Sequence, residues 1–217
     1  MKKILVLGAL VSVLPTLAFA HHPLGGMPME TFAQGILSGI GHPILGFDHL
    51  FFVALVGVAA LYTGRALLAP FAYISAMIVG CLMMSYNVDL PIKELVIGLS
   101  LLTLGYMVLS GRALSLGLAV AIFAGFGLFH GSAFGDSIAS QESAVGSQVL
   151  IGYLIGLGVV QYGISLGAGW VVHRALKATE AAAIQARLSG AVVAGIGLFL
   201  SMENLEGVVF QLAGWTS

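Results

Sequence analysis

Apolar residues gather in six long stretches along the chain, separated by short breaks that carry the charged residues. The stretches lie at about 43–63, 67–87, 92–110, 113–134, 147–172 and 188–212. Each approaches the roughly 20 apolar residues that a helix needs to cross a bilayer. No stretch suggests a strand barrel or a separate soluble domain. The pattern predicts an all-α membrane protein, with one six-transmembrane-helix bundle over residues 21–217.

Residues 1–20 form a different kind of apolar segment. Lys2 and Lys3 precede a short apolar run that ends in small residues, with Ala18 and Ala20 flanking Phe19. This order is typical of a cleaved secretory signal peptide. An uncleaved first helix is the alternative. Cleavage would place a new N-terminus at His21, on the outer side of the membrane.

Composition agrees with a location in the lipid bilayer. The 217 residues are 59% hydrophobic and 8% charged, whereas a soluble domain carries roughly 25% charged residues. The formal net charge of −1 leaves no basic stripe, so nucleic acid is not an expected partner. The single cysteine, Cys81, excludes an internal disulfide and any CxxC pair.

The charged residues also predict an orientation. With His21 outside, Lys93 is the one basic residue on the outer side, and Glu180 is the one acidic residue on the inner side. Five basic residues fall in the inner breaks: Arg65, Arg112, Arg174, Lys177 and Arg187. This is the positive-inside pattern. We therefore expect a multi-pass protein of the cytoplasmic (inner) membrane, with its mature N-terminus outside.

Glycine is abundant, with 30 residues. Two runs recur at roughly helical spacing: Gly117, Gly125, Gly127 and Gly131, and then Gly152, Gly156, Gly158 and Gly163. Small residues let transmembrane helices approach closely. We expect tight helix packing, and a glycine-lined ion path is the alternative.

Two clusters of ionisable residues interrupt the apolar stretches. His42, Asp48 and His49 lie at the outer end of the first predicted helix, and His130 and Asp136 lie at the outer end of the fourth. Ionisable groups inside apolar spans are costly and are usually functional. Taken singly, Asp48 could cap a helix and His42 could be an interfacial histidine. Together, the two clusters predict one shared site in the outer half of the membrane.

Nitrogen and oxygen donors of this kind suit Ni²⁺, Co²⁺ or Zn²⁺ rather than Cu⁺. On a regular helix, His42 and His49 would share a face but lie roughly 10 Å apart along the axis. Pro43 and Gly46 between them can break the helix. A bent entry would fold His42 back toward His49.

The expected mature N-terminus offers further metal donors. A free α-amine followed by His21 and His22 presents three nitrogen donors within two residues. Such a tail is long enough to reach the outer mouth of the bundle. A flexible outer tail without a metal role is the alternative.

These residues resemble the HupE/UreJ family, small membrane proteins regarded as nickel or cobalt permeases and often encoded near hydrogenase or urease genes. His42, Asp48 and His49 match its H-x5-D-H motif, and Phe129 to Asp136 looks like its second motif, F-H-G-x-A-x-G-x-E. The resemblance implies a metal role for His42, Asp48, His49 and His130. This chain departs from the family at Phe134, where a histidine is expected, and at Ser137, where an acidic residue is expected. Asp136 is the nearest carboxylate, and we add it on that ground.

The expected function is transport of a divalent transition-metal ion, nickel first and cobalt second, by a permease that is not an enzyme and holds no prosthetic group. The chain has no GxxxxGK[ST] loop for ATP. Two alternative functions fit the same residues: a non-transporting metal-binding or assembly factor for a metalloenzyme, and an intramembrane metalloenzyme using Zn²⁺. Expected partners are the metal ion and the lipid bilayer, with a homo-oligomer or a metalloenzyme maturation partner possible.

Overall fold

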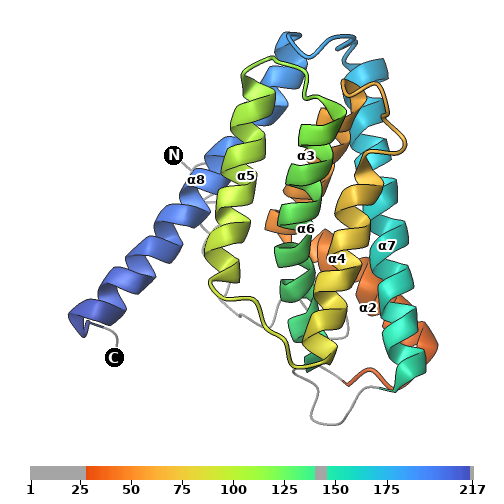
Figure 1. Ribbon diagram of the computed structural model, residues 1–217, viewed down its shortest axis with the longest axis vertical. Coiled ribbons are helices and arrows are strands. Elements are labelled where there is room, and N and C mark those ends of the chain that lie inside the picture. The colour runs from red at the N-terminus through yellow and green to blue at the C-terminus, as the bar shows by residue number, and fades with distance from the viewer. Residues whose placement is uncertain (1–27, 140–145, 216–217) are drawn as a thin grey trace, which may run out of the picture.

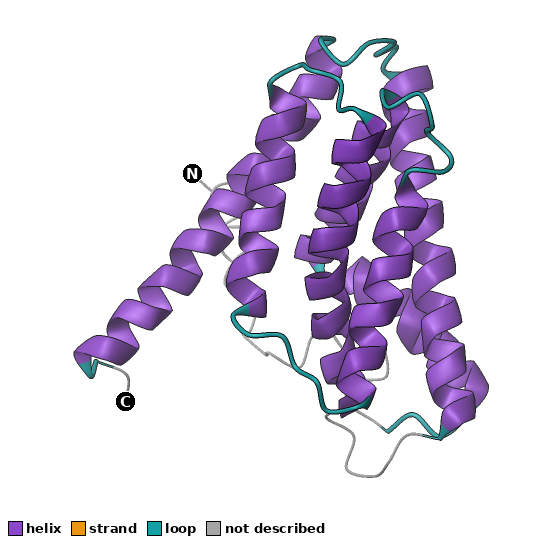
Figure 2. Ribbon diagram, in the orientation of Figure 1, coloured by secondary structure: helices purple, strands orange, loops and turns teal. Residues whose placement is uncertain are grey.

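The computed structural model describes residues 28–139 and 146–215, and within these ranges all regular structure is helical (Figure 2). The elements are α2 (Phe32–Leu45), α3 (Phe47–Leu61), α4 (Pro70–Ser85), α5 (Lys93–Leu109), α6 (Leu116–Ala139), α7 (Ser147–Trp170), a short π-helix η1 (Val171–Ala175) and α8 (Ile184–Ala213). The predicted all-α class is confirmed. The predicted signal peptide, residues 1–20, lies outside the described residues.

The first predicted helix is the one that differs most from the structure. Helix begins at Phe32, well before residue 43, because Thr31 and Gln34 form a reciprocal capping box at its start. The helix then breaks at Gly46, where the backbone is extended, and α2 and α3 meet at a bend of 83°. Pro43 lies inside α2, one turn before the break. The predicted bend between His42 and His49 is therefore present.

Three helical segments are long and apolar enough to cross a membrane on their own: α6, α7 continued by η1, and α8. The bent pair of α2 and α3 would add a fourth crossing if it counts as one span. Helix α4 is apolar but shorter. A multi-pass membrane protein is thus supported by length and composition.

Glycines fix how α2 packs on α7. A Cβ on Gly35 or Gly39 would collide with the α7 backbone, and a Cβ on Gly152 or Gly156 would collide with the α2 backbone. Both helices thus offer small residues four apart to each other. The two backbones can approach closely only because these side chains are absent.

The other two extensive helix pairs, α4 with α6 and α5 with α8, also pack closely through glycines. Gly80 of α4 faces the backbone of α6, and Gly131 of α6 faces the backbone of α4. Tight packing is therefore confirmed for many of the predicted glycines. It does not hold for Gly117, Gly125 and Gly163, since a Cβ there would meet nothing within 4 Å.

The helices alternate in direction, so their connections gather at two ends of the bundle (Figure 1). The connections at 62–69, 110–115 and 176–183 lie at one end, together with η1 and the start of α8. This basic end carries the five residues that the sequence assigns to the inner side. The connection at 86–92 lies at the opposite end, and α8 runs away from the bundle so that residues 205–215 are exposed.

Candidate functional site

The break at Gly46 brings His42 and His49 together. Their ring centroids are 6.2 Å apart, in an edge-to-face arrangement. The Nδ1 atom of His42 lies 2.9 Å from the Tyr153 hydroxyl and 3.0 Å from the Ser137 Oγ atom. A straight helix would separate His42 and His49 by two turns, but the break places them on one side of the bundle. Ser137 of α6 and Tyr153 of α7 hold His42 in place.

His49 and His130 form a buried pair. Their Nδ1 atoms are 2.7 Å apart, and the His130 Nε2 atom is 2.9 Å from the Ser100 Oγ atom. The Ser100 Oγ atom also lies 2.7 Å from the Ile97 carbonyl oxygen. The bonds can run from His49 through His130 to Ser100 or in the reverse direction, because the proton of each imidazole can sit on either ring nitrogen. In both arrangements one continuous hydrogen-bonded chain links Ser100, His130 and His49.

Asp48 is the carboxylate next to this pair. Its Oδ2 atom lies 3.8 Å from the His49 Nε2 atom, and its side chain is 26% exposed. Glu94, an exposed residue in the first turn of α5 next to Lys93, is a further carboxylate that the sequence analysis did not single out.

Phe134 fills the space between the two histidines of the first motif. Its ring is 5.0 Å from the His42 ring and 4.2 Å from the His49 ring, and it is fully buried. This is one of the positions where the chain departs from the family motif. An apolar ring therefore stands where a further nitrogen donor would have faced both histidines.

Asp136 lies apart from the histidines, because α6 continues without a break from Leu116 to Ala139. Its Oδ1 atom is 2.7 Å from the Lys93 ammonium, which also lies 2.9 Å from Asp89. The hydrogen bond from Lys93 holds the pKa of the exposed Asp89 carboxyl below its usual value. On this regular helix, His130 lies deeper and Asp136 lies near the end of the bundle. A metal role for Asp136 stays a prediction.

The predicted metal residues fall into three groups. His42, Asp48, His49 and His130 converge, Asp136 forms an ion pair, and His21 and His22 lie outside the described residues. Within the described ranges, no three His, Cys, Asp or Glu side chains are already placed to hold a metal ion. Binding would therefore require the side chains of the cluster to adjust.

Sequence reasoning missed the neutral partners of the histidines. Ser100, Ser137 and Tyr153 come from α5, α6 and α7, and each hydrogen-bonds a histidine of the cluster. Serine and tyrosine in an apolar helix give no signal of their own. Only the helix faces that meet at the site show their importance.

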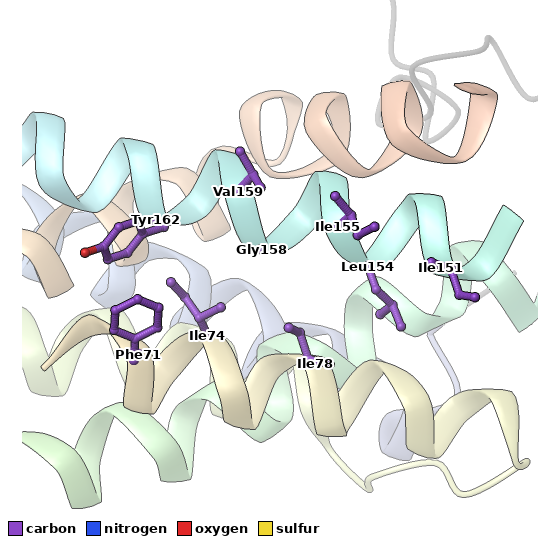
Figure 3. Close-up of a pocket in the computed structure, with 9 residues that line it drawn as sticks. All are labelled: Phe71, Ile74, Ile78, Ile151, Leu154, Ile155, Gly158, Val159 and Tyr162. Carbon is purple, nitrogen blue, oxygen red and sulfur yellow. The ribbon is translucent and has the colours of Figure 1, made fainter. Parts of the chain in front are cut away.

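The large apolar groove between α4 and α7 is a different kind of feature (Figure 3). It encloses about 400 Å³. It is lined by Phe71, Ile74, Ile78, Ile151, Leu154, Ile155, Gly158, Val159 and Tyr162. With no carboxylate or imidazole on its walls, it cannot coordinate a metal ion.

Helix α7 also contains a sequence pattern that resembles a catalytic motif but carries no catalytic chemistry. Gly163, Ser165 and Gly167 fit a G-x-S-x-G pattern, which in hydrolases marks a serine on a sharp strand-to-helix turn. Here Ser165 lies within α7 and donates its hydroxyl to the Tyr162 carbonyl oxygen. The backbone context of a nucleophile is therefore absent at this serine.

Comparison with known proteins confirms the family resemblance. The HupE / UreJ protein family matches residues 9–200, which is most of the chain. The chain belongs to the HupE/UreJ family. Protein HupE of Rhizobium leguminosarum bv. viciae is 29% identical over 189 residues, which cover 86% of this chain and 91% of that protein. No solved structure matches significantly. The HupE/UreJ family is associated with nickel and cobalt transport.

Proposed function

We propose that this protein transports a divalent transition-metal ion, nickel or cobalt, and that the ion enters through the cluster of His42, Asp48, His49 and His130. The observation that carries the proposal is the spacing between the His49 Nε2 atom and the Asp48 Oδ2 atom. They are 3.8 Å apart. Two ligands that each bind one ion at about 2.1 Å lie about 3.0–3.4 Å apart, so a closure of less than about 1 Å would let both donors reach the same ion.

The other residues of the cluster orient these two donors. The chain from Ser100 through His130 engages the His49 Nδ1 atom, so the Nε2 atom is the one left on the side of Asp48. A partner on the far nitrogen commonly orients a metal-binding imidazole. His42 lies beside His49 and is positioned by Tyr153. In this scheme His130 positions His49, and His42 joins when the ion arrives.

We further propose six crossings of the cytoplasmic membrane, with the bent pair of α2 and α3 as the first and the basic end inside. The five basic residues gathered at one end support this orientation. The histidine cluster then faces the outer half. A membrane potential of 100 mV would drive a divalent cation inward by roughly 4.6 kcal/mol, which suffices without ATP.

Uptake of radioactive nickel or cobalt into proteoliposomes tests the function. We expect His49→Ala and Asp48→Ala to abolish uptake while the protein keeps its elution volume in size-exclusion chromatography. His173→Ala is the matched control, because His173 lies in η1 near the basic end. Normal uptake in both cluster variants would refute the site. Metal binding without uptake by the unaltered protein would favour the assembly-factor alternative.

Single cysteines test the orientation. In a Cys81→Ala background, Arg65→Cys and Arg187→Cys should resist an impermeant thiol reagent in intact cells. Val88→Cys should react, because residue 88 is exposed in the connection at the other end. The reverse labelling pattern would show that the chain is inverted.

A further inference from the structure

Helix α7 carries a buried polar residue with no place in the site described so far. Gln161 lies in the middle of the helix and is fully buried. It follows Tyr153 by eight residues, so the two share a face of the helix. A carboxamide in the apolar interior of a membrane helix is costly unless it is paired or functional. The residue therefore requires an explanation.

The partner of Gln161 is Tyr73 of α4. The Tyr73 hydroxyl donates to the Gln161 Oε1 atom at 2.6 Å, and both side chains are fully buried. The Gln161 Nε2 group makes no hydrogen bond with the described residues. If the amide is turned over, its oxygen is left without a partner instead. In either case, one polar atom of the amide remains unsatisfied at a depth where this is expensive.

This pair adjoins the histidine cluster directly. The Tyr73 ring meets the His130 ring at 5.9 Å, and the Phe52 ring contacts both of them. Tyr73 lies in the first turn of α4, which starts at the basic end of the bundle. The Tyr73–Gln161 pair is thus the next polar layer on the way from the cluster to that end.

Holding α4 against α7 is the simpler role for such a bond, but the structure gives it little support. The apolar groove of Figure 3 lies between the same two helices, so their contact is not continuous along their length. Two apolar side chains would join them without leaving a polar atom unsatisfied. The unsatisfied amide is better suited to a ligand that arrives and leaves.

We propose that Tyr73 and Gln161 form a second station for the transported cation, occupied after it leaves the histidine cluster. This inference rests on the proposed transport function. A carbonyl oxygen has two lone pairs, so Gln161 Oε1 can ligate a cation while it still accepts from Tyr73. The Nε2 group can donate to a water molecule that the ion retains. Neutral oxygen ligands bind a divalent cation weakly enough to release it, which conduction requires.

The test compares uptake with binding. For Gln161→Leu we expect nickel uptake into proteoliposomes to be about tenfold slower, with the nickel affinity of the purified protein in equilibrium dialysis unchanged. Tyr73→Phe keeps the ring and removes the hydroxyl, and we expect uptake about threefold slower. Gln148→Leu is the matched control, since it makes the same substitution at an exposed position in the first turn of α7.

Each other outcome would overturn the inference in a recognisable way. Normal uptake in both variants, even with a changed melting temperature, would show that the pair is structural. Loss of nickel affinity together with uptake would assign Gln161 to the outer cluster. Absence of uptake by the unaltered protein would refute the proposed function itself. If Gln161→Leu does not fold, Tyr73→Phe and Gln161→Asn decide the question.

Discussion

The two motifs of this protein are carried by helices of opposite character. The first lies on a helix that breaks at Gly46, and the break brings His42 within 6.2 Å of His49, ring to ring. The second lies on the unbroken α6, where His130 stays in the core and Asp136 reaches the end of the bundle. Residues six or seven positions apart therefore converge only where the backbone bends. Glycine occurs in both motifs, but it lies at the bend in the first and permits close helix packing in the second.

The largest effect is expected from the glycine of the second motif. A Cβ on Gly131 would collide with the backbone of α4 at Met77, so Gly131→Val should prevent the bundle from forming. Gly125→Val, on the same helix, should be tolerated, because a Cβ there meets nothing within 4 Å. Fluorescence-detected size-exclusion chromatography measures the yield of folded protein. Equal yields would contradict a packing role for Gly131.

A smaller effect is expected from the glycine of the first motif. A Cβ on Gly46 would lie 2.9 Å from the His49 ring and 3.3 Å from the Asp48 carboxylate. The backbone there suits any residue, so Gly46→Ala should fold but displace the two donors by a few tenths of an ångström. We expect nickel uptake to fall about tenfold. A poorly folded Gly46→Ala protein would show instead that the bend itself needs glycine.

Next in size is the serine that orients His130. Ser100→Ala removes the hydrogen-bond partner of the buried His130 Nε2 atom, which costs about 1–3 kcal/mol. For a chain of this length we expect the melting temperature to fall by about 4 °C and nickel affinity to weaken severalfold. Ser110→Ala, at the C-cap of the same helix, removes an exposed hydroxyl that bonds only backbone groups and serves as the control. Equal behaviour of the two variants would argue against the hydrogen-bond chain.

The smallest effect is expected at the carboxylate of the second motif. Asp136→Asn removes a charge near the end of the bundle and leaves Lys93 paired with Asp89. We expect uptake at low nickel concentration to fall about twofold at low salt, and the difference to vanish at high salt as screening increases. Complete loss of uptake would make Asp136 a true ligand, and the contrast between the motifs would disappear.

Much of the helical framework could be predicted from hydrophobicity alone, because the apolar runs of α4 to α8 match their helices to within a few residues. The start of α2 could not, since its glycines and Ser38 weaken the apolar pattern and Thr31 sets the helix start through a local cap. The bend was predictable because Pro43 and Gly46 are both visible in the sequence. The partners Ser100 and Lys93 were not, since only the packing of α5 against α3 and α6 brings them to the site.

The glycine contacts between helices have a consequence for motion. In each of the three pairs, α2 with α7, α4 with α6, and α5 with α8, backbone lies against backbone where side chains are missing. Sliding either helix along its partner would drive the next side chain into that backbone. Each pair should therefore move as a rigid body. If the bundle opens alternately to its two ends, the hinges lie between these pairs. Helix α3, which follows the Gly46 break and contacts helices of all three pairs, is where the rigid bodies would move against one another.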